Sequence, residues 1–289
     1  MRAFVFSIMA SALCTSAALA QASHPQFSPD GSRLAYFTYD LEAGSGTVMI
    51  MDMVTGDAEA VETGNVWSVN PAGTPDGQGL VITGGQAGMG DDWDPVLVDL
   101  QSGETARLLD TPTREGHVHL SPDGSRLVFM RMGGGWDIHM LDMASREVTQ
   151  LTDTQAREFH PKWAGDGVHI SFDRGDPEGG SHIIRLNVDT LEETNIASAA
   201  EGARASLPAF AAGEADDVIF GLNGDTSQLM RASGLSIAPI YEAPEGWSVG
   251  GVSWRPVHDQ VAIALGQGNA VSRIVLLDLN SGETRPLAE

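Results

Sequence analysis

A four-residue turn signature recurs along this chain at nearly constant intervals. It reads Ser28-Pro29-Asp30-Gly31, Thr74-Pro75-Asp76-Gly77, Ser121-Pro122-Asp123-Gly124 and, in weaker form, Ala164-Gly165-Asp166-Gly167. Ala211 and Arg255 mark two fainter copies, so successive marks lie 43 to 47 residues apart. A period in this range, with strand patterns and no helical pattern, is typical of a β-propeller in which each repeat forms one four-stranded blade.

Each repeat carries four strand-like segments joined by turns. In the third repeat "HVHL" precedes the tetrad, and "RLVFMRM", "WDIHMLDM" and "EVTQLTD" follow it. Proline presets φ in the tetrad and glycine suits its last position, so the tetrad reads as a hairpin turn. The sequence therefore predicts an all-β, six-bladed propeller with four antiparallel strands per blade and blades starting near residues 24, 70, 117, 160, 207 and 251. Replacing a tetrad glycine such as Gly124 is expected to cost stability and to spare ligand binding.

Three stretches resemble a known repeat family. "HPQFSPDGSRLAYFT", "HLSPDGSRLVFMRMGGGWDIHMLDMASREVTQLTD" and "REFHPKWAGDG" are similar to the TolB-like propeller repeat, also called the WD40-like or PD40 repeat. The resemblance runs from His24 to the C-terminus and implies a module that binds envelope partners. TolB carries an α/β domain ahead of its propeller, which we do not expect here. The same repeat also serves peptidases and carbohydrate-active enzymes, so the fold leaves the function open.

The first residues read as an export signal. Arg2 supplies a positive charge, an apolar run follows, and Ala18-Leu19-Ala20 fits a cleavage site. We therefore expect a signal peptide over residues 1–20, cleavage near Ala20, a propeller over 21–289, and a periplasmic or secreted protein. The only cysteine, Cys14, lies within this signal. No other run is long and apolar enough to predict a membrane span.

The chain is strongly acidic, and its charge limits the partners it can have. It has 39 Asp and Glu against 16 Lys and Arg, a net charge of −23, and Lys162 is its single lysine. A nucleic-acid partner is excluded, because phosphate binding needs a basic stripe. We expect a monomer whose partner is an envelope protein, a peptide or a small anionic ligand.

Aligning the repeats places three histidines at one position. Four residues before the turn mark stand His24, His117 and His160, and the other repeats have Asn70, Leu207 and Gly251 there. Equivalent positions of a propeller form rings around the channel, so these imidazoles can converge on a divalent transition metal. His119 follows on the same face of its strand as His117 and is a further ligand-binding candidate. We expect that the histidines hydrogen-bond a neighbouring blade and that no cofactor is bound, with a bound divalent transition metal as the alternative.

A second ring lies three residues further upstream. It contains Arg114, Arg157 and Arg204, whose guanidinium groups match a carboxylate or phosphate. Alternatively, Glu115 and Glu158 pair with the arginines that precede them, with little effect on stability. Trp67 occupies the same ring position and is predicted to stack on a ligand at the rim.

Two functions remain open on these residues. The first is a non-enzymatic binding module that takes a protein, a peptide or a small anion at the channel rim. The second is a metal-assisted lyase or hydrolase acting on an acidic oligosaccharide. The second resembles the oligogalacturonate lyases, which hold a divalent metal on propeller histidines beside an arginine but have seven blades. In that mechanism the metal neutralises the uronate carboxylate and a histidine or arginine removes the neighbouring proton.

Overall fold

The computed structural model describes residues 21–40, 43–65, 67–85, 93–175, 177, 179–211, 214–268 and 271–288, and every regular element among them is a β-strand. The first twelve strands are β1 (Gln21–Phe27), β2 (Arg33–Asp40), β3 (Ser45–Asp52), β4 (Ala58–Ala60), β5 (Trp67–Gly73), β6 (Gly79–Gly85), β7 (Asp94–Asp99), β8 (Thr105–Arg107), β9 (Arg114–Leu120), β10 (Arg126–Met132), β11 (Trp136–Asp142) and β12 (Val148–Gln150). The others are β13 (Arg157–Trp163), β14 (His169–Gly175), β15 (Ser181–Asn187), β16 (Glu193–Ser198), β17 (Arg204–Phe210), β18 (Asp217–Asn223), β19 (Ser227–Ser233), β20 (Ser236–Glu242), β21 (Ser248–Arg255), β22 (Gln260–Gln267), β23 (Val271–Asp278) and β24 (Thr284–Ala288).

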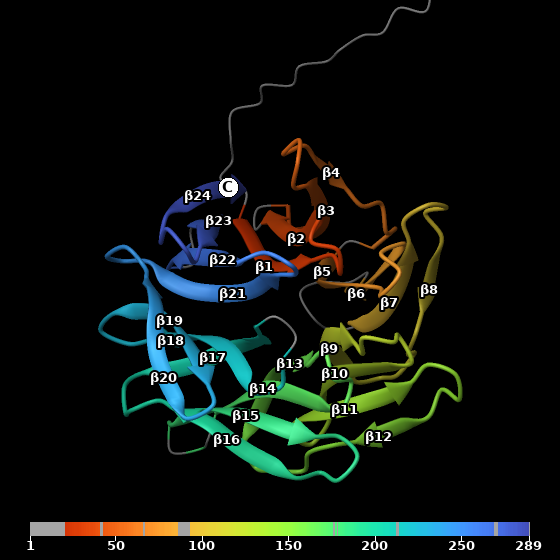
Figure 1. The fold of residues 1–289 in the computed structure, drawn as a ribbon. Helices are drawn as coiled ribbons and strands as arrows, with labels where there is room; N and C mark the ends of the chain where they lie inside the picture. Colours follow the sequence, from red (N-terminus) through yellow and green to blue (C-terminus); the bar gives the residue numbers. More distant parts are fainter. Residues whose placement is uncertain are drawn as a thin grey trace, which may run out of the picture.

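The strands pair in sequence order as antiparallel groups of four. β1 to β4 form the first group and β21 to β24 the sixth, and we number these groups as blades one to six. Figure 1 shows them arranged as a ring, with the first strand of each blade toward the centre and the fourth at the outside. The all-β propeller class predicted from the repeats is confirmed.

The tetrads form the hairpin between the first and second strand of a blade. Gly31, Gly77, Gly124 and Gly167 all have φ between 65° and 72°, a left-handed conformation that glycine adopts without steric cost. In the third tetrad, Asp123 Oδ1 accepts hydrogen bonds from the Ser121 hydroxyl at 2.6 Å and from the backbone N–H of Ser125 at 3.0 Å. The recurring residues of the tetrad are therefore turn residues.

The hydrophobic core lies between the blades. The second strands supply its largest fully buried side chains, Phe129, Phe172 and Phe220. Each cluster of buried side chains joins two blades. Leu229 of blade five packs with Val249 and Leu277 of blade six, for example. Burial of these apolar faces holds neighbouring blades together.

Blade one closes the ring by packing against blade six. β1 lies against β21, β22 and β23, and the ends of the coloured ribbon meet there in Figure 1. The Phe27 N–H donates to Ser253 Oγ at 3.1 Å, and Arg255 Nε donates to the Gly31 carbonyl at 2.9 Å. Among the described strands, β1 pairs only with β2 and β24 only with β23. Side-chain packing and single hydrogen bonds therefore join the two blades.

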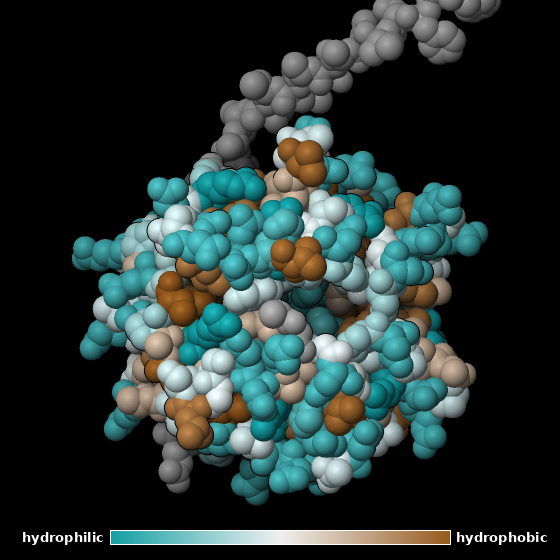
Figure 2. All heavy atoms as spheres, in the orientation of Figure 1, coloured by the Kyte–Doolittle hydropathy of each residue, from teal (hydrophilic) through white to brown (hydrophobic). Residues whose placement is uncertain are grey.

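Hydrophilic residues cover most of the face in Figure 2, which is hollowed near its centre. The described ranges contain no helix with the length and apolar character needed to cross a bilayer. The predicted signal peptide, residues 1–20, lies outside the described residues.

Candidate metal centre

A β-bulge in the first strand of each blade builds the narrow part of the channel. The pairing register shifts between Ser23 and Gln26 in β1, and equivalent shifts occur in β5, β9, β13, β17 and β21. The two residues inside each shift make no ladder pair, so proline fits the second of them in Pro25, Pro71, Pro161 and Pro208. In four of the six blades a proline at the second position therefore marks the bulge in the sequence, whereas Val118 and Gly251 occupy it in the other two.

The first residue of the bulge adopts an unusual backbone conformation. His24, Asn70, His117, His160 and Leu207 have φ between 49° and 57°. Few residues other than glycine adopt this left-handed conformation, and a surrounding structure must hold them in it. The same five positions line a small cavity of about 30 Å³ together with Gly251. The bulges of blades one to five thus each turn one side chain into the channel.

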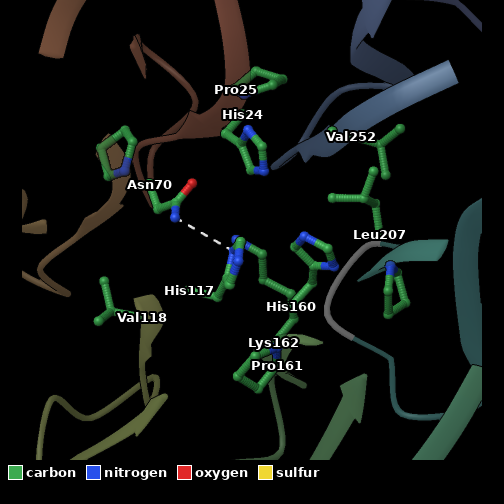
Figure 3. Close-up of a pocket in the computed structure, with 13 residues that line it drawn as sticks. His24, Pro25, Asn70, His117, Val118, His160, Pro161, Lys162, Leu207 and Val252 are labelled. Atoms are coloured by element: carbon green, nitrogen blue, oxygen red, sulfur yellow. Dashed lines mark hydrogen bonds between the residues drawn. The ribbon is translucent and has the colours of Figure 1, made fainter. Parts of the chain in front are cut away.

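The three predicted histidines meet at this cavity. His24, His117 and His160 each offer a ligand nitrogen, and the three nitrogens lie within 4.8 Å of one another. Figure 3 shows the imidazoles converging from three blades. A tetrahedral centre with bonds of about 2.1 Å separates its ligand atoms by about 3.4 Å. The limit of 4.8 Å exceeds that spacing, so a tetrahedral ion would have to draw the most distant nitrogens closer together.

Neighbouring side chains engage the Nδ1 atom of each ring. His160 Nδ1 lies 2.6 Å from Asp173 Oδ1, His24 Nδ1 lies 2.9 Å from Ser23 Oγ, and His117 Nδ1 lies 3.3 Å from Asn70 Nδ2. The Asn70 contact is the dashed line in Figure 3. An amide carries both a donor and an acceptor, so Asn70 can satisfy either tautomer of His117. These contacts leave the three Nε2 atoms as the available ligands, as is usual where a carboxylate or amide orients a metal-binding histidine.

Two observations favour a ligand for these nitrogens. His24 Nε2 is buried and has no hydrogen-bond partner among the described residues. Burial, together with smaller effects of the neighbouring His160 and Lys162, lowers the pKa of His24 to about 3. Burial likewise holds the pKa of His117 well below its ordinary value. Both imidazoles are therefore neutral at physiological pH, which is the form that binds metals.

Asp173 is a residue of the site that the sequence analysis missed. Its carboxylate is almost wholly buried and accepts from His160 Nδ1 and, at 3.2 Å, from the Leu207 N–H of blade five. The equivalent positions of other second strands are Phe37, Thr83, Met130 and Gly221, as the pairing with the first strand shows. The signal in the sequence that could have identified Asp173 was an acidic residue at a position that is uncharged in these other blades.

The three predicted arginines do not line the cavity. Arg114 lies over the Trp93 ring at 5.3 Å and Arg157 over the Trp136 ring at 5.8 Å, each on the preceding blade. Arg204 has a side chain 60% exposed, and its Nη2 atom is 3.7 Å from Asp173 Oδ2. Glu115 and Glu158 pair with Arg131 and Arg174 and not with the arginines that precede them. The alternative interpretation of Arg114 and Arg157 as partners of these acids is therefore wrong.

Trp67 and His119 are the other two predicted ligand-binding residues, and they lie in different surroundings. Trp67 is 4% exposed and packs against Gly46 and Val69 in the core, so its ring cannot stack on a ligand at the rim. His119 Nδ1 accepts the backbone N–H of Trp163 at 3.1 Å. His119 lines a second, wider cavity on the turn side of the channel, so it does not join the other histidines.

The single lysine separates the two cavities. Lys162 lines both of them, and its amine donates to Gln26 Oε1 at 3.0 Å. Burial lowers the pKa of Lys162 to about 8. A cation here opposes a bound metal ion, whereas the charge of Asp173 favours one.

Fold and site together define a β-propeller with a histidine-lined channel. Residues 16–232 match the family described as the TolB beta propeller domain, and the chain belongs to this family.

Several solved structures share the fold. TolB from Acinetobacter baumannii is 17% identical with a TM-score of 0.74, over 90% of this chain and 64% of that one. Putative TolB from Agrobacterium tumefaciens is 16% identical with a TM-score of 0.69, over 83% and 87%. An oligogalacturonate lyase solved in complex with manganese is 14% identical with a TM-score of 0.64, over 94% and 78%. The chain thus spans less than two thirds of the Acinetobacter protein, and at these identities the likeness shows the fold alone.

Proposed function

We propose that this chain is an exported binding module that holds a divalent transition metal in its channel on His24, His117 and His160. The observation that carries the proposal is the convergence of three imidazole nitrogens within 4.8 Å, each ring oriented through its Nδ1 atom. A set of three nitrogens suits zinc, nickel, cobalt or copper, and leaves at least one coordination position for a ligand. The ligand would be a protein, a peptide or a small anion that reaches the channel.

Elemental analysis of protein made without a histidine tag tests the metal. After incubation with Zn²⁺ and removal of excess by gel filtration, we expect about one equivalent in the wild-type protein. His117→Ala removes one of three ligands, so we expect its zinc content to fall to about a tenth. His258→Ala is the matched control, because His258 is exposed on a turn of blade six. A wild-type protein without stoichiometric metal, or an equal loss in His258→Ala, would contradict the proposal.

A lyase acting on an acidic oligosaccharide is the second candidate. It is favoured by the histidine cluster together with the similarity in fold to the manganese-bound oligogalacturonate lyase. The bound metal would neutralise the uronate carboxylate and so acidify the adjacent C–H. A base on the chain would take that proton while the glycosidic C–O bond breaks and a double bond forms. We rank this function second because none of the three arginines lines the cavity.

Ultraviolet absorbance of the unsaturated product separates the two functions. Zinc-loaded and manganese-loaded protein are incubated with oligogalacturonate. The binding module predicts no increase in absorbance above that of His117→Ala. An increase that requires His117 would establish the lyase.

A further inference from the structure

The turn side of the channel opens into a wide cavity. Its volume is about 610 Å³, which lies in the range of sites that enclose a small molecule. Aromatic and proline residues from several blades form its wall. They include Phe27, Trp163, Phe210 and Trp254 at the ends of the first strands, and Pro29, Pro75, Pro122 and Pro256 at the turns.

The charge of this cavity is opposite to that of the chain. The sequence has 39 acidic residues, yet no Asp or Glu is among the residues that line the cavity. Its one lysine is among them, and no arginine is. Lys162 forms no ion pair with a described carboxylate, and its amine donates to the neutral Gln26 amide. A partly buried cation without a counter-ion is unfavourable, so an anion in the cavity would be stabilised.

His119 supplies a second donor on the same wall. Its Nδ1 accepts the Trp163 N–H at 3.1 Å, so Nδ1 carries no proton. The ring proton then sits on Nε2, which makes Nε2 a hydrogen-bond donor. The lysine ammonium and this N–H together match the two oxygens of a carboxylate.

We infer that the turn-side cavity binds a small carboxylic acid with an apolar body, its carboxylate on Lys162 and His119 and its body against the aromatic and proline wall. This site goes beyond the proposed function, because it uses none of the three metal-binding histidines and does not need a metal. Lys162 then has its counter-ion in the ligand.

Binding of 4-phenylbutyrate and of its neutral analogue 4-phenylbutanol tests the site. Calorimetry and tryptophan fluorescence are suitable measurements, because Trp163 and Trp254 line the cavity. Both are made on metal-free protein in EDTA. We expect the acid to bind at least about tenfold more tightly than the alcohol, because only the acid pairs with the partly buried ammonium.

Lys162→Met keeps the length of the side chain and removes its charge, so acid and alcohol should bind this variant equally. If Lys162→Met fails to fold, Lys162→Arg is tested in its place. It keeps the charge and should retain a preference for the acid. Arg285→Met is the matched control, since Arg285 is exposed on the outer strand β24, and it should behave as wild type.

Three results would overturn the site: no binding of the acid at millimolar concentration, equal binding of acid and alcohol to wild type, or an unchanged preference in Lys162→Met. Binding that appears only after zinc loading and disappears in His117→Ala would place the carboxylate on the metal. That result would overturn the turn-side site and support the metal centre. Retention of binding in His117→Ala without any metal would support the turn-side site alone.

Discussion

A single carboxyl group shows how burial sets the charge of a side chain in this protein. Asp94 of blade two is 2% exposed and pairs with Arg107 at 2.7 Å through Oδ2. Its Oδ1 atom is buried and has no hydrogen-bond partner among the described residues, and the same holds for Oε2 of Glu115 on blade three. Burial, together with the nearby Glu115, raises the pKa of Asp94 to about 6 against the opposing charge of Arg107. Arg107 is half exposed, so solvent weakens its effect and burial dominates.

This raised pKa predicts that the folded protein loses stability as the pH rises from about 4 to about 6. A carboxyl whose pKa is higher in the folded than in the unfolded state binds more protons when folded, so the free energy of unfolding falls as pH rises through this window. The Asp94→Asn variant cannot ionise at this position. The fall in its free energy of unfolding across this pH range should therefore be smaller than that of the wild type by about 1 to 2 kcal/mol. Denaturant unfolding from pH 4 to pH 7.5 measures it.

Asp110→Asn is the control, because Asp110 also lies near Arg107, at 3.6 Å, but is 90% exposed. Its pH profile should parallel that of the wild type. Parallel profiles of Asp94→Asn and wild type would show that Asp94 is ionised throughout.

The first strand of each blade has a bulge in its middle and a hairpin turn at its end, and the two features have different roles. The turn at its end needs a glycine in the left-handed region, and this glycine lies close to the neighbouring blade. A Cβ atom on Gly124 would lie 3.3 Å from Pro75 of the preceding turn. The bulge in its middle directs one side chain into the channel, as with His117. Stability and binding therefore depend on different residues of one strand.

Gly124→Val tests this division. The left-handed φ of 72° is strained for a branched residue, so we expect a loss of about 1 to 3 kcal/mol in the free energy of unfolding. Gly73→Val is the control, since a Cβ atom on Gly73 meets nothing within 4 Å. Zinc content should stay at the wild-type level in Gly124→Val as long as the protein is folded. A loss of zinc without a loss of stability would contradict the structural role of the turn.

The ring as a whole is held by contacts that repeat from blade to blade. Arg33 donates to the Gly77 carbonyl and Arg126 to the Gly167 carbonyl, so in each case an arginine reaches the tetrad of the next blade. Arg255 makes the corresponding contact across the closure, to Gly31 of blade one, and its guanidinium lies 5.8 Å from the Phe27 ring centroid. Blades one and six are therefore joined by an arginine-to-glycine contact like those between blades one and two and between blades three and four.

Arg255→Ala should weaken the closure. A hydrogen bond from a charged donor to a half-buried carbonyl contributes about 1 to 2 kcal/mol, so we expect the free energy of unfolding to fall by that amount. Arg285→Ala removes the same charge from an exposed position and should have little effect. Thermal and denaturant unfolding measure both variants. Equal effects would mean that net charge, and not the closing contact, determines the change.

Turn chemistry and strand alternation are local properties, so the spacing of the tetrads was sufficient to predict the propeller class and the strand order. Alignment of the repeats also predicted which residues occupy equivalent positions, and His24, His117 and His160 lie together as ring positions should. Side-chain surroundings could not be read in this way, because they depend on packing between residues far apart in the chain. Trp67 is buried against Gly46, Arg114 and Arg157 stack on tryptophans, Asp173 orients His160, and Lys162 lies in a cavity without acids. Each of these contacts joins different strands, and most join different blades, so they exist only once the ring has brought those strands together.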